Sequence, residues 1–277
     1  MSQSRQPAPV AAAVMPAVGQ LVSQSAYVFK GTIVRDGASN VAIVPASQNA
    51  AVVRVDDVLE AIPTLTTYHG KQITIQLREP LPTGGAAVFF ANPWIFAENI
   101  AVVESGRLPA DTDLAALRRE LVNARQALAD LRLQQVLVSA SLVIVGTVTA
   151  SAMPFEHGSG RAISFHDPLW RAAVVAVRSV EKGKLDAPTV TVVYASSGDR
   201  RWFATPKFPP KQEGIYLLHS DQMATVSEPF KVGGLTATNP LDYQPLDQLD
   251  RVRRLLKAGI PTQSVPAAAV AGRRTAR

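Results

Sequence analysis

The sequence predicts a mainly β protein with helices, built as two tandem five-stranded barrels that are each followed by an α-helix. The first observation behind this class is an internal repeat. Leu21–Val34 aligns without a gap to Val136–Thr149, and both segments contain a strand-like Gly-Thr step followed by a β-branched residue. The second observation is that each copy continues with alternating apolar and polar residues, the pattern of half-buried strands, and then with a helical pattern.

The remaining strands recur in the same order in both copies. An apolar alternation rich in valine comes first, then a second short alternation, and then a glycine turn that leads into an aromatic or aliphatic run. In the first copy these segments are 51–59, 71–77 and 84–90, and in the second copy they are 173–180, 189–194 and 213–218.

The helices repeat as well. Asp113–Leu121 and Gln248–Leu256 share their apolar spacing and an Arg-Arg pair, and Pro109, Asp111 and Thr112 provide start signals for the first helix. The predicted organisation is therefore a flexible N-terminal arm (1–20), a first barrel (21–105), a linker helix (106–135), a second barrel (136–246), and a short helix with a basic disordered tail (247–277).

The second copy carries a resemblance to a known family. It combines Gly146-Thr-Val on an apolar strand, a valine-rich strand that ends near Glu181-Lys182-Gly183, and a proline-rich turn into Gly214-Ile-Tyr-Leu-Leu. This pattern resembles bacterial netrin/TIMP-like modules, which are OB-fold barrels with a packed helix. The resemblance implies a tandem of OB-like barrels with a binding or inhibitory role, and it carries over no enzyme activity.

The composition narrows the class of protein. The 277 residues include no cysteine, which excludes disulfides, thiolate metal sites and thiol nucleophiles. Residues 250–277 hold seven of the 28 basic residues but one of the 22 acidic ones, which leaves 21 of each in the first 249 residues. The net charge of +6 therefore lies in the C-terminal tail, and a general polyanion contact is expected there or in a local patch.

No segment has the roughly 18 uninterrupted apolar residues that span a bilayer, so no transmembrane segment is expected. The apolar stretch Val10–Val18 is interrupted by Pro16 and is short for the core of an export signal, so we interpret it as part of the flexible arm. A cytoplasmic location is slightly favoured, and a secreted or periplasmic one stays open.

The linker helix carries an apolar seam with alternating spacings of three and four residues, which is typical of a short coiled coil. Two interpretations need this same stripe. One is a homodimer through residues 114–131, and the other is a helix that packs on its own barrel. The seam consists of Leu114, Leu117, Leu121, Ala124, Leu128 and Leu131.

Catalytic and metal sites have few candidates. His157 and His166, with Glu156 and Asp167, flank a Gly-Ser-Gly loop and offer two imidazoles and two carboxylates for Zn²⁺ or for acid–base chemistry. Such polar residues are also expected in any loop between strands. There is no nucleophile elbow and no phosphate-binding glycine loop. We therefore expect no catalytic residue, no metal and no cofactor.

The most distinctive local composition interleaves aromatic rings with cations between two strands of the second barrel. Rings that stack on bases and cations that meet phosphates are typical of surfaces that bind single-stranded nucleic acid. The other interpretation is a structural plug at the end of the barrel. The candidate binding residues are Arg200, Arg201, Trp202, Phe203, Lys207, Phe208 and Lys211.

These observations favour a non-enzymatic binding or assembly protein that presents two OB-like modules to a protein partner. The alternative is single-stranded nucleic acid binding through the Arg200–Lys211 loop and the basic C-terminal tail. A third class, a hydrolase or metal enzyme, would depend on His157 and His166.

Overall fold

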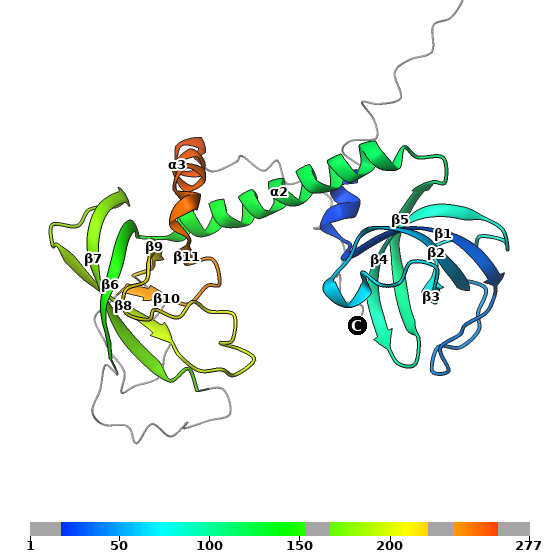
Figure 1. The fold of residues 1–277 in the computed structure, drawn as a ribbon, viewed down its shortest axis with the longest axis horizontal. Coiled ribbons are helices and arrows are strands. Elements are labelled where there is room, and N and C mark those ends of the chain that lie inside the picture. Colours follow the sequence, from blue (N-terminus) through cyan, green and yellow to red (C-terminus); the bar gives the residue numbers. More distant parts are fainter. Residues whose placement is uncertain (1–17, 153–166, 221–234, 260–277) are drawn as a thin grey trace, which may run out of the picture. The chain divides into compact units, whose positions relative to one another are not determined.

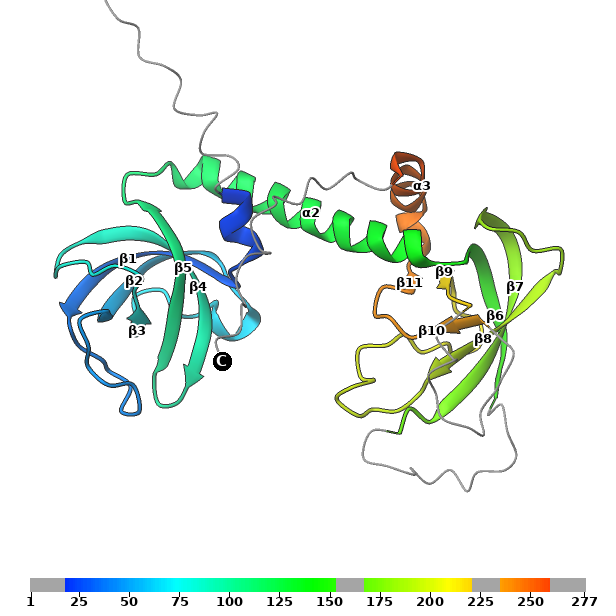
Figure 2. The same cartoon turned by 180° about the vertical axis from the view of Figure 1, so that it is seen from behind.

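The computed structural model describes residues 18–152, 167–220 and 235–259. The chain is mainly β with few helices, as predicted, and divides into two compact units, Met1–Ala129 and Asp130–Arg277. The division falls inside the long helix α2 (Leu114–Ser139), and each unit holds one sheet (Figures 1 and 2).

Five strands of the first unit form a closed barrel, in which the hydrogen-bonded order is β1-β2-β3-β5-β4. β3 and β5 run parallel, and all other neighbours are antiparallel. The strands are β1 (Tyr27–Asp36), β2 (Ala50–Glu60), β3 (Gln72–Gln76), β4 (Ala86–Phe96) and β5 (Ile100–Pro109), with a 3-10 helix (Pro63–Leu65) between β2 and β3.

The barrel is filled by alternate residues of its strands, because successive side chains of a strand point to opposite faces. On β1, Tyr27 and Phe29 lie inside, and Val28 lies outside. The ring of Tyr27 stacks on Phe29 with centroids 4.7 Å apart, and Phe29 lies 5.3 Å from Phe89 of β4. Each fully buried side chain of this kind contributes about 1.5–3 kcal/mol to folding.

The outer side of β1 and β4 is covered by helices. Val18 and Val22, on a short helix over residues 18–23, are buried against this face. Residues 18–20 are therefore helical, and the expected flexible arm of residues 1–20 is wrong for its last three residues. The cluster under the helices contains Val18, Val22, Val28, Val88, Phe90, Leu117 and Leu121.

The leucine seam of α2 is part of this same cluster. Leu117 and Leu121 are 2% and 3% exposed, and Leu114, Ala124 and Leu128 pack partly buried beside them. The structure thus shows the packing interpretation of the seam. A homodimer through residues 114–131 would need leucines that already lie against their own barrel.

The second unit holds a six-stranded sheet in the order β10-β8-β7-β6-β9-β11, rather than the five-stranded barrel expected. Its elements are β6 (Leu142–Ala152), β7 (Trp170–Lys182), β8 (Thr189–Ala195), β9 (Glu213–Leu218), β10 (Leu235–Ala237), β11 (Tyr243–Gln244), a 3-10 helix (Leu246–Gln248) and α3 (Leu249–Ala258).

The strand ladders of the two units have the same irregularities. In the β1–β2 ladder the register shifts at Val28/Phe29, Lys30/Gly31 and Ile33/Arg35, and in the β6–β7 ladder at Val143/Ile144, Val145/Gly146 and Val148/Ala150. Each shift in the second unit begins 115 residues after the matching shift in the first unit. Gly31 and Gly146 are separated by the same 115 residues. The repeat seen in the sequence is therefore a repeat of structure.

The Gly-Thr step marks a close approach of neighbouring strands. A Cβ atom on Gly31 would lie 2.7 Å from the side chain of Val53, and one on Gly146 would lie 2.7 Å from Val175. Because real Cβ atoms do not approach other atoms this closely, both positions require glycine.

The sixth strand arises because the fifth strand is interrupted in the second unit. In the first unit Arg107 of β5 pairs with Phe89 of β4, and in the second unit Tyr243 of β11 pairs with Tyr216 of β9. The first half of the interrupted fifth strand is β10, which pairs in parallel with β8 as β5 pairs with β3 in the first unit. An isolated bridge between His219 and Thr236, with N–H···O distances of 3.0 and 2.9 Å, connects β10 to the end of β9.

Helices cover the outer side of the second sheet as well. Leu133 and Leu137, in the last turns of α2, are buried with Val252 of α3 against β6 and β9. The strand β5 continues to Pro109 and α2 runs on to Ser139, so both limits of the expected linker helix (106–135) were too early. The expected tail is outside the described residues from position 260.

One strand signal was misread in the sequence. Gly214, expected to mark a turn like Gly84, lies inside β9 and pairs with Gly146. A Cβ atom there would lie 2.3 Å from the ring of Tyr243, so this glycine makes room for an aromatic ring and does not shape a turn.

Candidate binding surfaces

The loop between β8 and β9 contains the seven candidate residues, and the structure divides them into a buried and an exposed group. Phe208 is fully buried in the core of the second unit, with its ring 5.0 Å from Tyr194 and 5.3 Å from Tyr216. It closes this end of the sheet as a plug and offers no surface to a ligand.

Lys207 stabilises the loop through hydrogen bonds of its ammonium group. Its Nζ donates to the carbonyl oxygens of Ala195, Ser197 (3.2 Å) and Trp202 (3.0 Å), and to Oγ1 of Thr205 (3.0 Å). Burial lowers the pKa of this ammonium group. Because its donors are used inside the protein, Lys207 holds the loop in place and is not part of a ligand surface.

The exposed group forms a tight turn. The carbonyl oxygen of Asp199 accepts the N–H groups of Trp202 (2.9 Å) and Phe203 (2.7 Å), and its carboxylate accepts that of Arg201 (2.8 Å). Arg200 and Arg201 are exposed, and Phe203 is 76% exposed. Lys211 is also exposed, but it lies eight residues or more from this turn in sequence.

A residue that the sequence analysis did not select completes the turn. Trp170, the first residue of β7, contacts Trp202 edge to face with centroids 5.7 Å apart, and the guanidinium of Arg201 lies 5.2 Å from the centre of the Trp202 ring. The pairing of Trp170 with Ala195 brings these distant segments together. We call Trp170 and Arg200–Phe203 the aromatic turn.

A second surface lies on the β4–β5 hairpin of the first unit. Trp94 and Phe96 are 51% and 57% exposed at the end of β4. The neighbouring Ile95 packs instead with Val41 and Val44 of the β1–β2 loop, which holds the hairpin against that loop. We call Trp94 and Phe96 the hairpin aromatics.

The turn of this hairpin is also fixed by polar contacts. Asn99 Nδ2 donates to the carbonyl oxygen of Asn40 (3.0 Å), and the backbone N–H of Asn40 donates to Thr74 Oγ1 of β3 (2.9 Å). The two exposed rings therefore stand on a rigid support, which lowers the entropy lost when they are covered by a partner.

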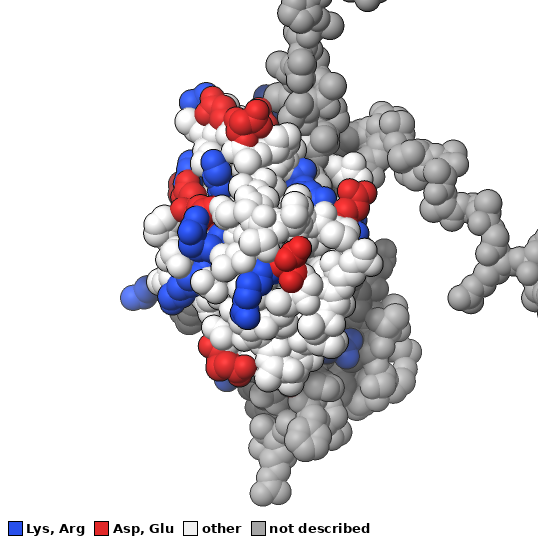
Figure 3. Space-filling model, turned by 90° about the vertical axis from the view of Figure 1, so that its right-hand side faces the viewer, with Lys and Arg blue, Asp and Glu red and all other residues white. Residues whose placement is uncertain are grey.

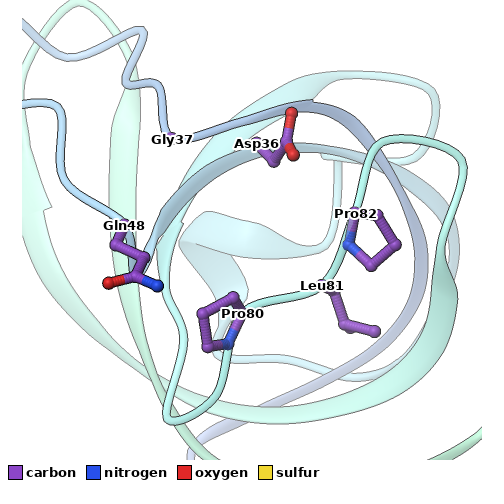
Figure 4. A pocket seen from close by; sticks show the side chains of 6 residues that line it. All are labelled: Asp36, Gly37, Gln48, Pro80, Leu81 and Pro82. Atoms are coloured by element: carbon purple, nitrogen blue, oxygen red, sulfur yellow. The ribbon is translucent and has the colours of Figure 1, made fainter.

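The end of the first barrel opens into a shallow pocket of about 460 Å³ (Figure 4). Asp36 and Gln48 border it from the two ends of the β1–β2 loop, and Pro80, Leu81 and Pro82 form the other side. The carboxylate of Asp36 already accepts a hydrogen bond from Thr83 Oγ1 (2.8 Å). The pocket thus combines an apolar proline wall with the polar side chains of Asp36 and Gln48.

A groove recurs in both units between the second strand and the helix that follows the barrel. In the first unit it is lined by Leu59, Leu121 and Val122, and in the second unit by their counterparts Glu181, Leu256 and Lys257. At these three positions the first unit has apolar residues and the second has two charged ones, whereas an arginine, Arg118 or Arg253, lines both grooves.

An arginine at the same helical position crosses each groove. Arg118 makes two hydrogen bonds to Asp57 (2.9 and 2.8 Å), and Arg253 makes two to Glu181 (2.8 and 3.0 Å). Hydrogen bonds from Arg253 hold the pKa of Glu181 below its ordinary value. These arginines fasten each closing helix to its strand.

The charges on the first unit do not form a field of one sign. The face in Figure 3, which is the right-hand side of Figure 1, carries Lys and Arg interspersed with Asp and Glu, with uncharged surface between them.

The histidine candidates lie mostly elsewhere. His157 and His166 are outside the described residues, and His69 is exposed. His219 is 5% exposed, and its Nε2 lies 2.9 Å from Oδ1 of the fully buried Asp242. In the described part of the chain, no three His, Asp or Glu side chains gather as ligands for a metal ion.

The helices in these described ranges do not include one with the length and apolarity to cross a membrane. Comparison of the chain with protein-family models finds no match, and a search of curated proteins finds none either.

Proposed function

We propose that this chain is a non-enzymatic binding or assembly protein, whose tandem OB-like modules present the hairpin aromatics to a protein partner. The closed five-stranded barrel with the order β1-β2-β3-β5-β4 supports an OB-like fold for the first unit, because OB folds are five-stranded Greek-key barrels. The matching ladder irregularities support the same fold for the second unit, with its fifth strand split into β10 and β11. A netrin-like origin belongs to this proposal, and a helix packed on each sheet supports it.

The observation that carries the proposal is the exposure of Trp94 and Phe96 on a supported hairpin. Exposed Trp and Phe are enriched at the centres of protein interfaces, where truncation of one such ring commonly weakens binding. The mixed charges of Figure 3 agree with a protein partner. The hairpin joins β4 to β5, so it belongs to the loop region that OB folds use for ligands.

The experiment compares three full-length proteins: wild type, the double variant Trp94→Ala/Phe96→Ala, and the control Val122→Ala. Val122 is 69% exposed on α2 of the same unit, away from the hairpin strands in sequence. Proteins retained from the source cells are identified by mass spectrometry, and each candidate is purified and titrated by calorimetry.

The double variant should weaken the affinity of the true partner by about 30-fold or more, because interface anchors contribute about 2 kcal/mol each. The control should bind within about twofold of wild type, since isolated exposed side chains contribute little. A purified partner that binds all three proteins equally, or no partner that binds in purified form, would overturn the proposal.

A further inference from the structure

We infer that the aromatic turn of the second unit is a separate binding site for single-stranded nucleic acid. It lies on the second unit, and neither the hairpin aromatics nor a protein partner is needed for it. The ligand class follows from four side chains on one turn: a highly exposed ring, a guanidinium that lies over an indole, and a further exposed cation.

The chemistry of each side chain points to this ligand. Phe203 is 76% exposed, and a ring in this position presents a face on which a base can stack. Arg201 lies over the Trp202 ring, and its guanidinium can both stack on a base and attract phosphate. Arg200, which precedes it, supplies a further cation for the backbone of the strand.

The turn is held in shape before any ligand arrives. Three backbone N–H groups converge on Asp199, and the carbonyl oxygen of Trp202 accepts Oγ1 of Thr205 (2.7 Å) as well as Nζ of Lys207. Trp170 supports the ring of Trp202 from β7. Such pre-organisation reduces the entropy cost of binding, which matters for a site of only a few nucleotides.

The corresponding loop in the first unit has an exposed cation, Arg78, but no ring on which a base could stack. Leu81 and Pro82 precede the left-handed Gly84, and Phe208 and Pro209 precede the left-handed Lys211 at the same spacing. The first-unit loop contains no aromatic residue and borders the open pocket of Figure 4. Binding is therefore expected from the second unit alone.

The test is fluorescence anisotropy of a labelled oligothymidylate of about 15 nucleotides with the full-length protein, at low and near-physiological salt. Phe203→Ala should weaken binding about fivefold or more, the loss expected for one stacked base. Arg200→Ala should weaken it and should lower the dependence of affinity on salt by about one ion.

Matched controls separate this site from other sources of binding. Val122→Ala removes an exposed apolar side chain from the first unit, and Arg119→Ala removes an exposed arginine from α2; both should bind within about twofold of wild type. A third protein, with Arg273, Arg274 and Arg277 replaced by alanine, measures the contribution of the C-terminal tail.

The inference is overturned if wild type fails to bind at low salt, or if Phe203→Ala binds like wild type. Binding that disappears only in the tail variant would also overturn it, as would equal affinity for a duplex of the same length, because both outcomes require phosphate contacts without stacking. None of these results bears on Trp94 and Phe96, so the two proposals fail separately.

Discussion

Gly84 and Lys211 occupy the same left-handed backbone position in the two units. Their φ angles are +84° and +72°, and their N–H groups donate to the carbonyl oxygens of Ile33 (2.8 Å) and Val148 (2.7 Å), which lie 115 residues apart. Glycine adopts this conformation without strain, whereas a residue with a Cβ atom loses about 1 kcal/mol there. The second unit therefore carries a strained lysine where the first has a relaxed glycine.

Lys211→Gly should raise the free energy of unfolding by about 1 kcal/mol, because it removes this strain while the exposed side chain gives up no contact. Gly84→Ala should lower it by a similar amount. Urea denaturation followed by circular dichroism measures both. Lys211→Ala keeps the Cβ atom and is the control, so equal stability of the Ala and Gly variants at position 211 would contradict the explanation.

This pair also shows which parts of the fold were readable in the sequence. The repeat was visible because close strand contacts require glycine at both Gly31 and Gly146. The turn before the fourth strand was not visible as a repeat in the sequence, because Gly84 and Lys211 share a backbone conformation but not a residue type. The search for a turn glycine led to Gly214, which is needed for the ring of Tyr243 instead.

The fifth strand of the second unit was missed because it is interrupted. In the second unit this strand is divided into β10 and β11, which are three and two residues long, and such short strands leave no alternation to detect.

Polar partners also change between the units. The carbonyl oxygen of Ser25 is bound by Arg125 of the helix, whereas that of its counterpart Ala140 is bound by Lys182 of the strand.

The aromatic turn was predicted in part. Its cations and rings are contiguous in sequence, so Arg200–Phe203 could be selected from composition. Trp170 could not, because only the pairing of β7 with β8 brings it to Trp202. The roles of Lys207 and Phe208 depend on burial, which the interleaved composition does not reveal.

The position of the leucine seam predicts what a charge would do to it. Leu121→Glu should lower the free energy of unfolding by about 3 kcal/mol or more, because it places a carboxylate in a cluster where Leu121 is 3% exposed. Val122→Glu changes the adjacent residue, which is 69% exposed, and should cost less than about 0.5 kcal/mol. Thermal unfolding and light scattering follow both variants. A folded Leu121→Glu protein that merely changes from dimer to monomer would restore the coiled-coil interpretation.

Two buried tyrosines provide a matched pair for hydrogen-bond energetics. The hydroxyl of Tyr27 is buried and has no hydrogen-bond partner in the described part of the chain, whereas that of Tyr216 donates to the carbonyl oxygen of Gln212 (2.8 Å). Burial raises the pKa of both phenols. Tyr27→Phe should therefore leave stability unchanged or raise it by about 1 kcal/mol, and Tyr216→Phe should lower it by about 1 kcal/mol. Urea denaturation measures the free energy of unfolding of both variants. A larger loss of stability in Tyr27→Phe than in Tyr216→Phe would refute this explanation.

Helix α2 contributes buried residues to both units, and this predicts which fragments of the second unit are stable. Residues 130–277 keep Leu133, Leu137 and Val252, which are buried together, and this fragment should unfold cooperatively. Residues 136–246 retain all the strands but lose Leu133 and Val252, and they should be less stable by several kcal/mol, since each lost leucine or valine costs about 2 kcal/mol or more. Circular dichroism during heating compares the two. Equal melting temperatures would show that the flanking helices are dispensable.

The bridge at His219 predicts a pH dependence of the second unit. Two contacts hold His219 in place: its Nε2 lies 2.9 Å from Oδ1 of Asp242, and its backbone pairs with Thr236. The hydrogen bond to Asp242 raises the pKa of His219, while burial and the charge of Lys182 oppose this rise.

Because the folded protein holds the proton of His219 more tightly than the unfolded chain does, the charged form stabilises the fold. This contribution is complete below the ordinary histidine pKa of about 6.5 and is lost as the pH rises through the higher pKa of the folded state. The free energy of unfolding should therefore fall more steeply above about pH 6.5 in wild type than in His219→Gln. The control is His69→Gln, which changes an exposed histidine and should keep the wild-type slope. Urea denaturation across this pH range measures the slopes, and a His219→Gln protein with the same pH dependence as wild type would show that the pair with Asp242 is not the titrating element.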